Sequence, residues 1–173
     1  MKLVLLASGN GSLAQAIVDA RIAEILAVAT DNKKSLVLSR FPNAKLIEFR
    51  EPRTEWESEL ESYIASLEPD YVVSVGFMRI LSPSFVNRFR VINTHPALLP
   101  NFPGAHAVAD ALAAGVSQTG STVHWVDEGV DTGKIIAQVK VDVLPEDDED
   151  SLHERIKIAE RKLIVDVLKE LDV

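Results

Sequence analysis

The chain of 173 residues contains no cysteine. That absence excludes disulfides, thiolate nucleophiles, iron–sulfur clusters and cysteine-bound zinc. A basic surplus is missing too, because 18 Lys and Arg residues against 26 Asp and Glu residues leave a formal charge of −8. Non-specific binding to nucleic acid or to an anionic membrane usually needs a positive footprint, so we expect neither partner.

Long apolar runs are absent as well. No stretch reaches the roughly 18 residues that a membrane span needs. The apolar start, residues 3–7, is shorter than the roughly 7–15 residues at the centre of a signal peptide, and a polar, glycine-rich turn follows at once. We therefore interpret this start as a buried strand and expect a soluble, cytoplasmic protein.

What is present is the composition of an ordinary globular domain, 47% hydrophobic and 25% charged. Short apolar runs rich in β-formers alternate with helical patterns. This alternation predicts an α/β fold, a doubly wound and mostly parallel sheet with helices on both faces. The expected strands are 3–7, 25–30, 45–49, 71–75, 91–94, 122–126 and 135–143. Capping boxes at 54–57 and 151–154 predict the starts of two helices. We predict one domain, 1–173, with halves 1–90 and 91–173.

The turn SGNGS (8–12) lies between the first expected strand and a helix. Glycine permits a sharp turn, and the free amides at a helix start suit a phosphate. A plain tight turn with a serine cap is the structural alternative. Gly9, Gly11 and Ala14 also fit the dinucleotide fingerprint, with Asp31 about 20 residues further on. A nicotinamide-dependent oxidoreductase is therefore an alternative function, although the chain leaves little room for a separate substrate domain.

Asn93 and His95 stand two residues apart in an expected strand, so they project to the same face. They lie at its carboxyl end, where open α/β sheets bind ligands. An amide can donate a hydrogen bond to a developing oxyanion, and an imidazole can move a proton near neutral pH. A satisfied core histidine beside a proline-rich loop is the structural alternative.

The acidic, glycine-punctuated loop 126–133 follows a later strand. A carboxylate from this loop that reached His95 would orient the ring and stabilise its charged form. The alternative is a polar turn. No two histidines have the spacing of zinc ligands, so a metal site is not expected.

Four segments in this order resemble the folate-dependent glycinamide ribonucleotide formyltransferases. They are SGNGS (8–12), GFMRIL (76–81), NTHPALLPNFPG (93–104) and VHWVDEGVDTG (123–133), and the similarity extends from residue 1 to about residue 165. The resemblance implies transfer of a formyl group from 10-formyltetrahydrofolate, the co-substrate, to the amine of glycinamide ribonucleotide in de novo purine biosynthesis. It implies direct attack through a tetrahedral intermediate, with no metal. Half 1–90 would bind the phosphate or nucleotide, and half 91–173 would bind folate and catalyse.

Carried over position by position, the resemblance implies a catalytic trio of Asn93, His95 and Asp131. The implied substrate-binding residues are Gly11, Ser12, Leu13, Arg53, Met78 and Glu160. The implied folate-binding residues are Arg79, Ile80, Leu81, Asn93, Asp127, Glu128 and Asp131. A cis peptide bond at Leu99–Pro100 is also implied.

The chain departs from the family pattern at three positions, where Leu13 replaces Asn, Ala97 replaces Ser and Lys134 replaces Pro. The first change removes a side-chain contact to the phosphate and leaves only the backbone amide. A folate formyl-hydrolase and the methionyl-tRNA formyltransferases share the same trio. They remain alternatives beside the oxidoreductase, and the oligomeric state stays open.

Overall fold

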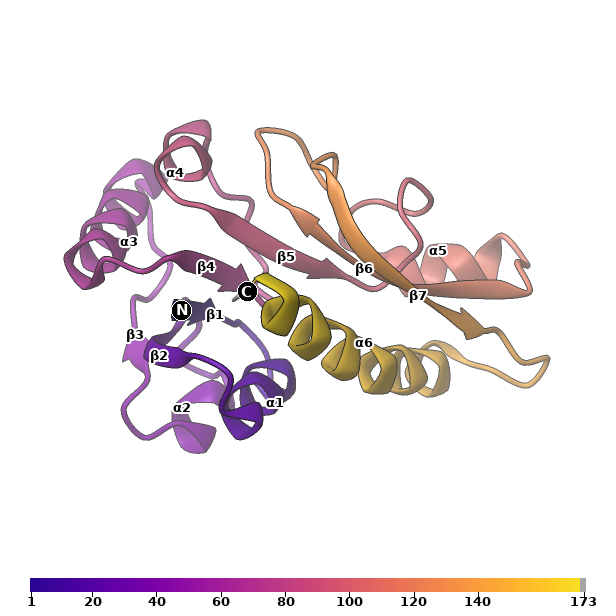
Figure 1. The fold of residues 1–173 in the computed structure, drawn as a ribbon. Helices are drawn as coiled ribbons and strands as arrows, with labels where there is room; N and C mark the ends of the chain where they lie inside the picture. The colour runs from indigo at the N-terminus through magenta and orange to yellow at the C-terminus, as the bar shows by residue number, and fades with distance from the viewer. Residues whose placement is uncertain (172–173) are drawn as a thin grey trace. The chain divides into compact units, whose positions relative to one another are not determined.

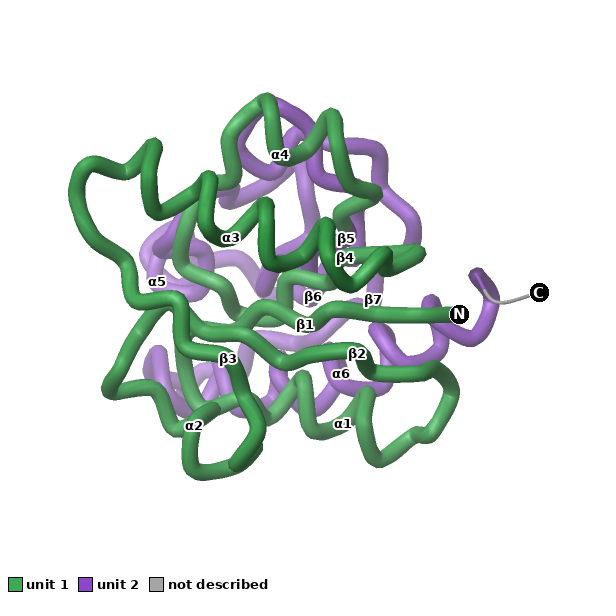
Figure 2. The backbone as a smooth tube through the Cα atoms, turned by 90° about the vertical axis from the view of Figure 1, so that its left-hand side faces the viewer, with its two compact units in different colours: residues 1–91 green, residues 92–173 purple. Residues whose placement is uncertain are grey.

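The computed structural model describes residues 1–171 and divides the chain into two compact units, Met1–Val91 and Ile92–Val173 (Figure 2). The single domain, 1–173, with functional halves 1–90 and 91–173, stays a prediction. Within the described residues, no helix combines the length and the apolar character that crossing a bilayer requires.

Unit 1 is built on four parallel strands in the order β3-β2-β1-β4. The strands are β1 (Lys2–Leu6), β2 (Glu24–Thr30), β3 (Lys45–Leu46) and β4 (Tyr71–Ser74). The helices are α1 (Ser12–Ala20), α2 (Val37–Arg40), α3 (Arg53–Leu67) and α4 (Pro83–Arg88). Figure 2 shows α1 and α2 on one side of the strands and α3 and α4 on the other. Both faces of β1 are therefore covered, which explains its continuous apolar run.

Unit 2 contains three antiparallel strands, β5 (Val91–His95), β6 (Gln118–Trp125) and β7 (Ile135–Asp142). Its helices are α5 (Ala107–Ala113) and α6 (Glu149–Leu171), and α6 runs along β6 and β7 (Figure 1). Val108 of α5 packs with Leu152 and Ile156 of α6, and apolar side chains at the end of β7 join this core. The pairs of β1 with β2, β1 with β4 and β2 with β3 in unit 1 are parallel, as predicted for most of the sheet.

Both predicted capping boxes are wrong in position. Helix α3 begins at Arg53, and its first amide is bound by the Glu51 carboxylate at 2.8 Å. The Glu57 carboxylate instead accepts the amide of Ser82 at 2.6 Å, across to the start of α4. Helix α6 begins at Glu149, and its box lies three residues earlier than expected. The amide of Ser151 donates to the Asp148 carboxylate at 2.8 Å, and the amide of Asp148 donates to the Ser151 hydroxyl at 3.1 Å.

Trp56 of α3 is the largest fully buried side chain of the described residues. Its indole Nε1 donates to the carbonyl of Ile47 at 2.9 Å, and its ring packs edge-on against Phe49 and is stacked with Phe77. The ring therefore joins α3 to the segments that follow β3 and β4.

Trp56→Phe should lower the free energy of unfolding by about 1–3 kcal/mol, because a buried carbonyl loses its donor and the core loses volume. Equilibrium urea unfolding followed by far-ultraviolet circular dichroism measures this difference. Ile158→Ala on the exposed face of α6 is the control and should change stability little. An unchanged unfolding midpoint in Trp56→Phe would contradict the assigned role of the indole.

Candidate active site

The SGNGS turn of unit 1 forms the entrance to α1. Gly11 caps this helix in the left-handed conformation, with φ of 74°. The amide of Ser12 donates to the Asn10 side chain at 2.9 Å, whereas the next amides, in the first turn, have no acceptor within the helix. The side chain of Leu13 is buried, so only its backbone is presented at the turn. This geometry suits an anion held by backbone amides.

Asp31, the acid of the dinucleotide fingerprint, is occupied by protein partners. Its carboxylate is 4% exposed and accepts hydrogen bonds from Ser8 Oγ at 2.5 Å and from Arg79 Nε at 2.6 Å. One partner binds each carboxylate oxygen. A ribose diol would have to reach a buried carboxylate that already has protein partners, so the structure does not favour the nicotinamide-dependent alternative.

The same network fixes the turn after β4. The amide of Met78 donates to Ser8 Oγ at 2.9 Å, and the Arg79 guanidinium lies 3.8 Å over the ring of Phe49. A cavity of about 350 Å³ opens beside these groups within unit 1. The Arg79 side chain is thus held by Asp31 and Phe49 at the edge of this cavity. The Met78 side chain is 64% exposed.

Arg53 contacts the segment 79–81. Its guanidinium Nη2 donates to the carbonyl of Ile80, and its Nε lies 4.0 Å from the Glu57 carboxylate. The Leu81 side chain that follows is buried. These contacts place Arg53 at the predicted folate-binding segment. The substrate-binding role that the resemblance implies for it stays a prediction.

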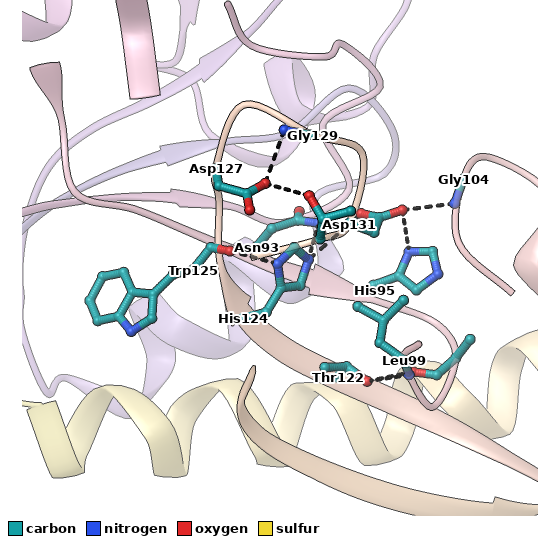
Figure 3. A network of polar contacts seen from close by, with 12 residues as sticks. Asn93, His95, Leu99, Gly104, Thr122, His124, Trp125, Asp127, Gly129 and Asp131 are labelled. Carbon is teal, nitrogen blue, oxygen red and sulfur yellow. Dashed lines mark hydrogen bonds and ion pairs between the residues drawn. The ribbon is translucent and has the colours of Figure 1, made fainter. Parts of the chain in front are cut away.

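In unit 2, the structure brings the three residues of the predicted trio into one polar network (Figure 3). His95 Nδ1 lies 3.4 Å from Asp131 Oδ2. Asn93 Nδ2 lies 3.2 Å from His124 Nε2, and His124 Nε2 lies 3.6 Å from Asp131 Oδ1. Asp131 is held with φ of 54°, and its Oδ2 accepts the amide of Gly104 at 2.8 Å. Asn93 is thus connected to Asp131 through His124.

The partners of His95 are both oxygen acceptors. Nε2 lies 2.7 Å from the carbonyl of Phe102, so it carries a proton, and Nδ1 faces the Asp131 carboxylate. The ring is buried at the end of β5, with an oxygen atom facing each of its nitrogens.

Asp131 is held as a carboxylate by its neighbours. Burial acts to raise its pKa, but the imidazole of His124, 3.6 Å away, the hydrogen bond from the Gly104 amide and the nearby His95 together lower that pKa below its ordinary value. The carboxylate therefore remains charged and able to orient His95 throughout the neutral range.

The loop before Asp131 is organised by Asp127. Its Oδ1 accepts the amide of Gly129 at 3.0 Å and the hydroxyl of Thr132 at 2.6 Å. Asp127 and Glu128 are exposed. The structure thus gives Asp127 a role in shaping the loop, and the predicted folate contact of both side chains stays untested. The Leu99–Pro100 peptide bond is cis, as the resemblance implied.

Glu160 of α6 is a buried carboxyl group, 3% exposed, that accepts a hydrogen bond from Ser121 Oγ at 3.2 Å. Burial raises its pKa to about 7, although the hydroxyls of Thr94 and Ser121 partly offset that rise. A carboxyl group that titrates near neutral pH can accept or release a proton during turnover.

Glu160 should make the protein less stable as pH rises from 4.5 towards 7, because its folded pKa lies above its unfolded value. In that window the folded chain holds a proton that the unfolded chain has lost. Glu160→Gln should abolish this component, which amounts to about 3 kcal/mol. Urea unfolding at a series of pH values measures it as the difference between wild type and variant.

Glu154→Gln, on the exposed side of the same helix, is the matched control and should leave the pH dependence of stability unchanged. If Glu160→Gln and wild type lose stability in parallel across this window, the raised pKa is wrong.

Sequence patterns missed several members of the unit 2 network. His124, the carbonyl of Phe102 and the amide of Gly104 were not among the predicted site residues. The histidine stands in a regular strand, and the other two groups are backbone atoms of a loop. Alternation along β6 places His124 on one face, but nothing in the sequence indicates which strand lies beside it. Within the described residues, no cluster of three potential metal ligands is found.

Comparison with known proteins identifies the family of this chain. The family model for formyl transferases matches residues 1–168. The phosphoribosylglycinamide formyltransferase of Mycobacterium tuberculosis (strain CDC 1551 / Oshkosh) is 49% identical over 175 residues, which cover 95% of this chain and 81% of that protein. The trifunctional purine biosynthetic protein adenosine-3 of Drosophila pseudoobscura pseudoobscura is 42% identical over 174 residues, 92% of this chain and 13% of that protein.

Among solved structures, the phosphoribosylglycinamide formyltransferase of Streptococcus pneumoniae TIGR4 is similar with a TM-score of 0.91 and 38% identity. The match covers 99% of both chains. This likeness confirms the predicted α/β fold class.

Proposed function

This chain belongs to the formyl transferase family, and we propose that it transfers the formyl group of 10-formyltetrahydrofolate to the amine of phosphoribosylglycinamide, in purine biosynthesis. The observation that carries the proposal is the network of Asn93, His95 and Asp131 in unit 2. It places an amide donor and an imidazole paired with a carboxylate at the end of one strand, which is what acyl transfer to an amine needs.

The reaction joins the substrate amine to the formyl carbon and breaks the bond from that carbon to N10 of the folate. Asn93 and protonated His95 donate hydrogen bonds to the formyl oxygen as negative charge develops on it. Asp131 holds His95 in position and favours its charged form. The proton lost by the amine passes to N10 through His95 or a water molecule.

One rearrangement accompanies this role of His95. The carbonyl of Phe102 holds the Nε2 proton at 2.7 Å. That proton must be shared with the formyl oxygen, or the loop that carries Phe102 must shift. Hydrogen bonds of a catalytic group often reach their productive geometry only in the complex with substrate.

The substrate phosphate is proposed to bind the backbone amides of Gly11, Ser12 and Leu13 at the start of α1, with the hydroxyl of Ser12. The phosphate would replace the Asn10 side chain as acceptor of the Ser12 amide. This site offsets the net charge of −8 locally, because a helix N-terminus favours an anion. Glu160 receives the amino end of the same substrate, and Met78 contacts it.

The folate is proposed to bind the backbone of 79–81 together with the 127–131 loop. Arg53 supports that segment through the carbonyl of Ile80. The proposal involves small-molecule substrates in the cytoplasm, without metal, nucleic acid or membrane. The oligomeric state stays open.

The test is an assay of the purified protein with phosphoribosylglycinamide and a 10-formylfolate analogue, followed by absorbance of the deformylated folate. Product should appear only when both substrates are present. Product formation without the ribonucleotide would instead identify a formyl-hydrolase. Absorbance changes that require a nicotinamide cofactor would identify an oxidoreductase.

Asn93→Ala and His95→Ala should each lower kcat by roughly 10²–10³ with a modest change in KM, because each removes one donor to the oxyanion. Asp131→Asn keeps the shape but loses the charge, so its rate should also fall strongly. The losses should not add, since the three residues act as one unit. Single-turnover rates at saturating substrates measure them.

His153→Ala in α6 is the control and should keep the wild-type rate. A near-wild-type rate in His95→Ala, with the fold intact by circular dichroism, would show that β5 is only a scaffold.

Gly11→Ala should raise the KM for the ribonucleotide on the order of tenfold and leave that for the folate unchanged, because lost phosphate contacts weaken one substrate only. A Cβ at Gly11 would be strained by the φ of 74° and would meet Val37 Cγ2 at 3.1 Å, so we expect the turn to relax and its amides to lose their alignment. Gly115→Ala is the matched control, because Gly115 has a similar φ of 66° and open space around it. Equal effects on both substrates would contradict the phosphate site.

A further inference from the structure

We infer that His124 is the positioning residue that sets the direction of the Asn93 amide, an inference that rests on the proposed formyl transfer. The register of β5 and β6 pairs Asn93 with His124 directly. The histidine is 1% exposed, and its Nε2 lies 3.2 Å from Asn93 Nδ2 (Figure 3). His124 is therefore a fixed, water-excluded partner of a residue proposed to stabilise the oxyanion.

The other ring nitrogen defines the tautomer of His124. Nδ1 lies 2.8 Å from the carbonyl of Trp125. A carbonyl only accepts hydrogen bonds, so Nδ1 carries the proton. In the neutral ring, Nε2 then holds a lone pair, and the Asn93 amide nitrogen donates to it.

This bond decides which end of the Asn93 amide serves the reaction. With one N–H bound to His124, the amide nitrogen keeps its second N–H for the formyl oxygen. Asn93 makes no other side-chain hydrogen bond within residues 1–171. Without the acceptor on His124, the amide can turn by half a rotation and present its oxygen, which would repel the developing negative charge.

The two histidines of the network therefore have complementary hydrogen-bond environments. His95 faces two acceptors, whereas His124 faces the Trp125 carbonyl on one side and the Asn93 donor on the other. If Nε2 of His124 carried a proton, it would point that proton at Asp131 Oδ1, 3.6 Å away, and would lose the Asn93 amide. The neutral ring is the form that positions Asn93.

Two substitutions separate this role from a merely structural one. In His124→Gln, the side-chain oxygen can occupy the place of Nε2 and still accept from Asn93, while the bond to Trp125 is lost. In His124→Asn, the side-chain nitrogen can replace Nδ1 and hold the Trp125 carbonyl, but no acceptor reaches Asn93. The inference predicts that His124→Gln keeps kcat within about threefold, whereas His124→Asn loses roughly tenfold to a hundredfold, with KM values nearly unchanged.

The reverse order of the two variants would overturn the inference, because it would show that the ring mainly anchors the Trp125 carbonyl. Equal losses in both variants would overturn it as well. In an Asn93→Ala background, His124→Asn should cause no further loss of kcat, because a positioning residue acts only through its partner. Full additivity of the two losses contradicts the inference.

The tautomer of His124 can be measured without an activity assay, so this inference can be tested separately from the proposed function. Nitrogen-15 NMR of histidine-labelled protein at neutral pH should show His124 protonated at Nδ1 and bare at Nε2. The opposite tautomer, or a doubly protonated ring, refutes the inference whatever the activity. If wild-type protein shows the expected tautomer but no formyl transfer, the proposed function fails while the hydrogen bond to Asn93 stands.

Discussion

The antiparallel register of β5 against β6 is the constraint on which the chemistry of unit 2 depends. It sets Asn93 opposite His124 and His95 opposite Thr122. The Thr122 hydroxyl donates to the carbonyl of Ala97 at 2.7 Å and accepts the amide of Leu99 at 3.1 Å, so it also anchors the proline-rich loop that follows β5. Because side chains alternate along a strand, a slip of one residue would turn the whole set to the other face. The register therefore positions the polar network and the proline-rich loop together, and a change of register would disrupt both.

In unit 1, a sequence pattern typical of dinucleotide binding has a structural role instead. The turn after β1 and the acid after β2 match a dinucleotide fingerprint, yet Asp31 binds Ser8 and Arg79. Those bonds engage both oxygens of the carboxylate. The amide of Met78 donates to Ser8 Oγ, which connects the turn after β4 to the end of β1. The acid thus braces the loops around α1, while the first-turn amides of that helix remain available to an anion.

Two carboxyl groups of unit 2 have pKa values displaced in opposite directions. For Asp131, histidines and a backbone amide outweigh burial, and its pKa falls. For Glu160, burial outweighs the neighbouring hydroxyls, and its pKa rises to about 7. Stability alone would favour an uncharged side chain at the second position. Such displaced acids are concentrated at functional sites, which supports placing both in the reaction.

The sequence by itself determined the α/β alternation, the buried first strand, the glycine turn before α1 and the pairing of Asn93 with His95 on one face. Each depends on residues that are neighbours along the chain, where periodicity and turn chemistry operate. Only the tertiary structure decided that Asn93 meets His124, that Ser121 meets Glu160 and that Asp31 meets Arg79, across separations of 31, 39 and 48 residues. It also decided that the Glu57 carboxylate accepts the amide of Ser82. Such partners depend on strand order, register and helix packing, and no spacing within the sequence encodes them.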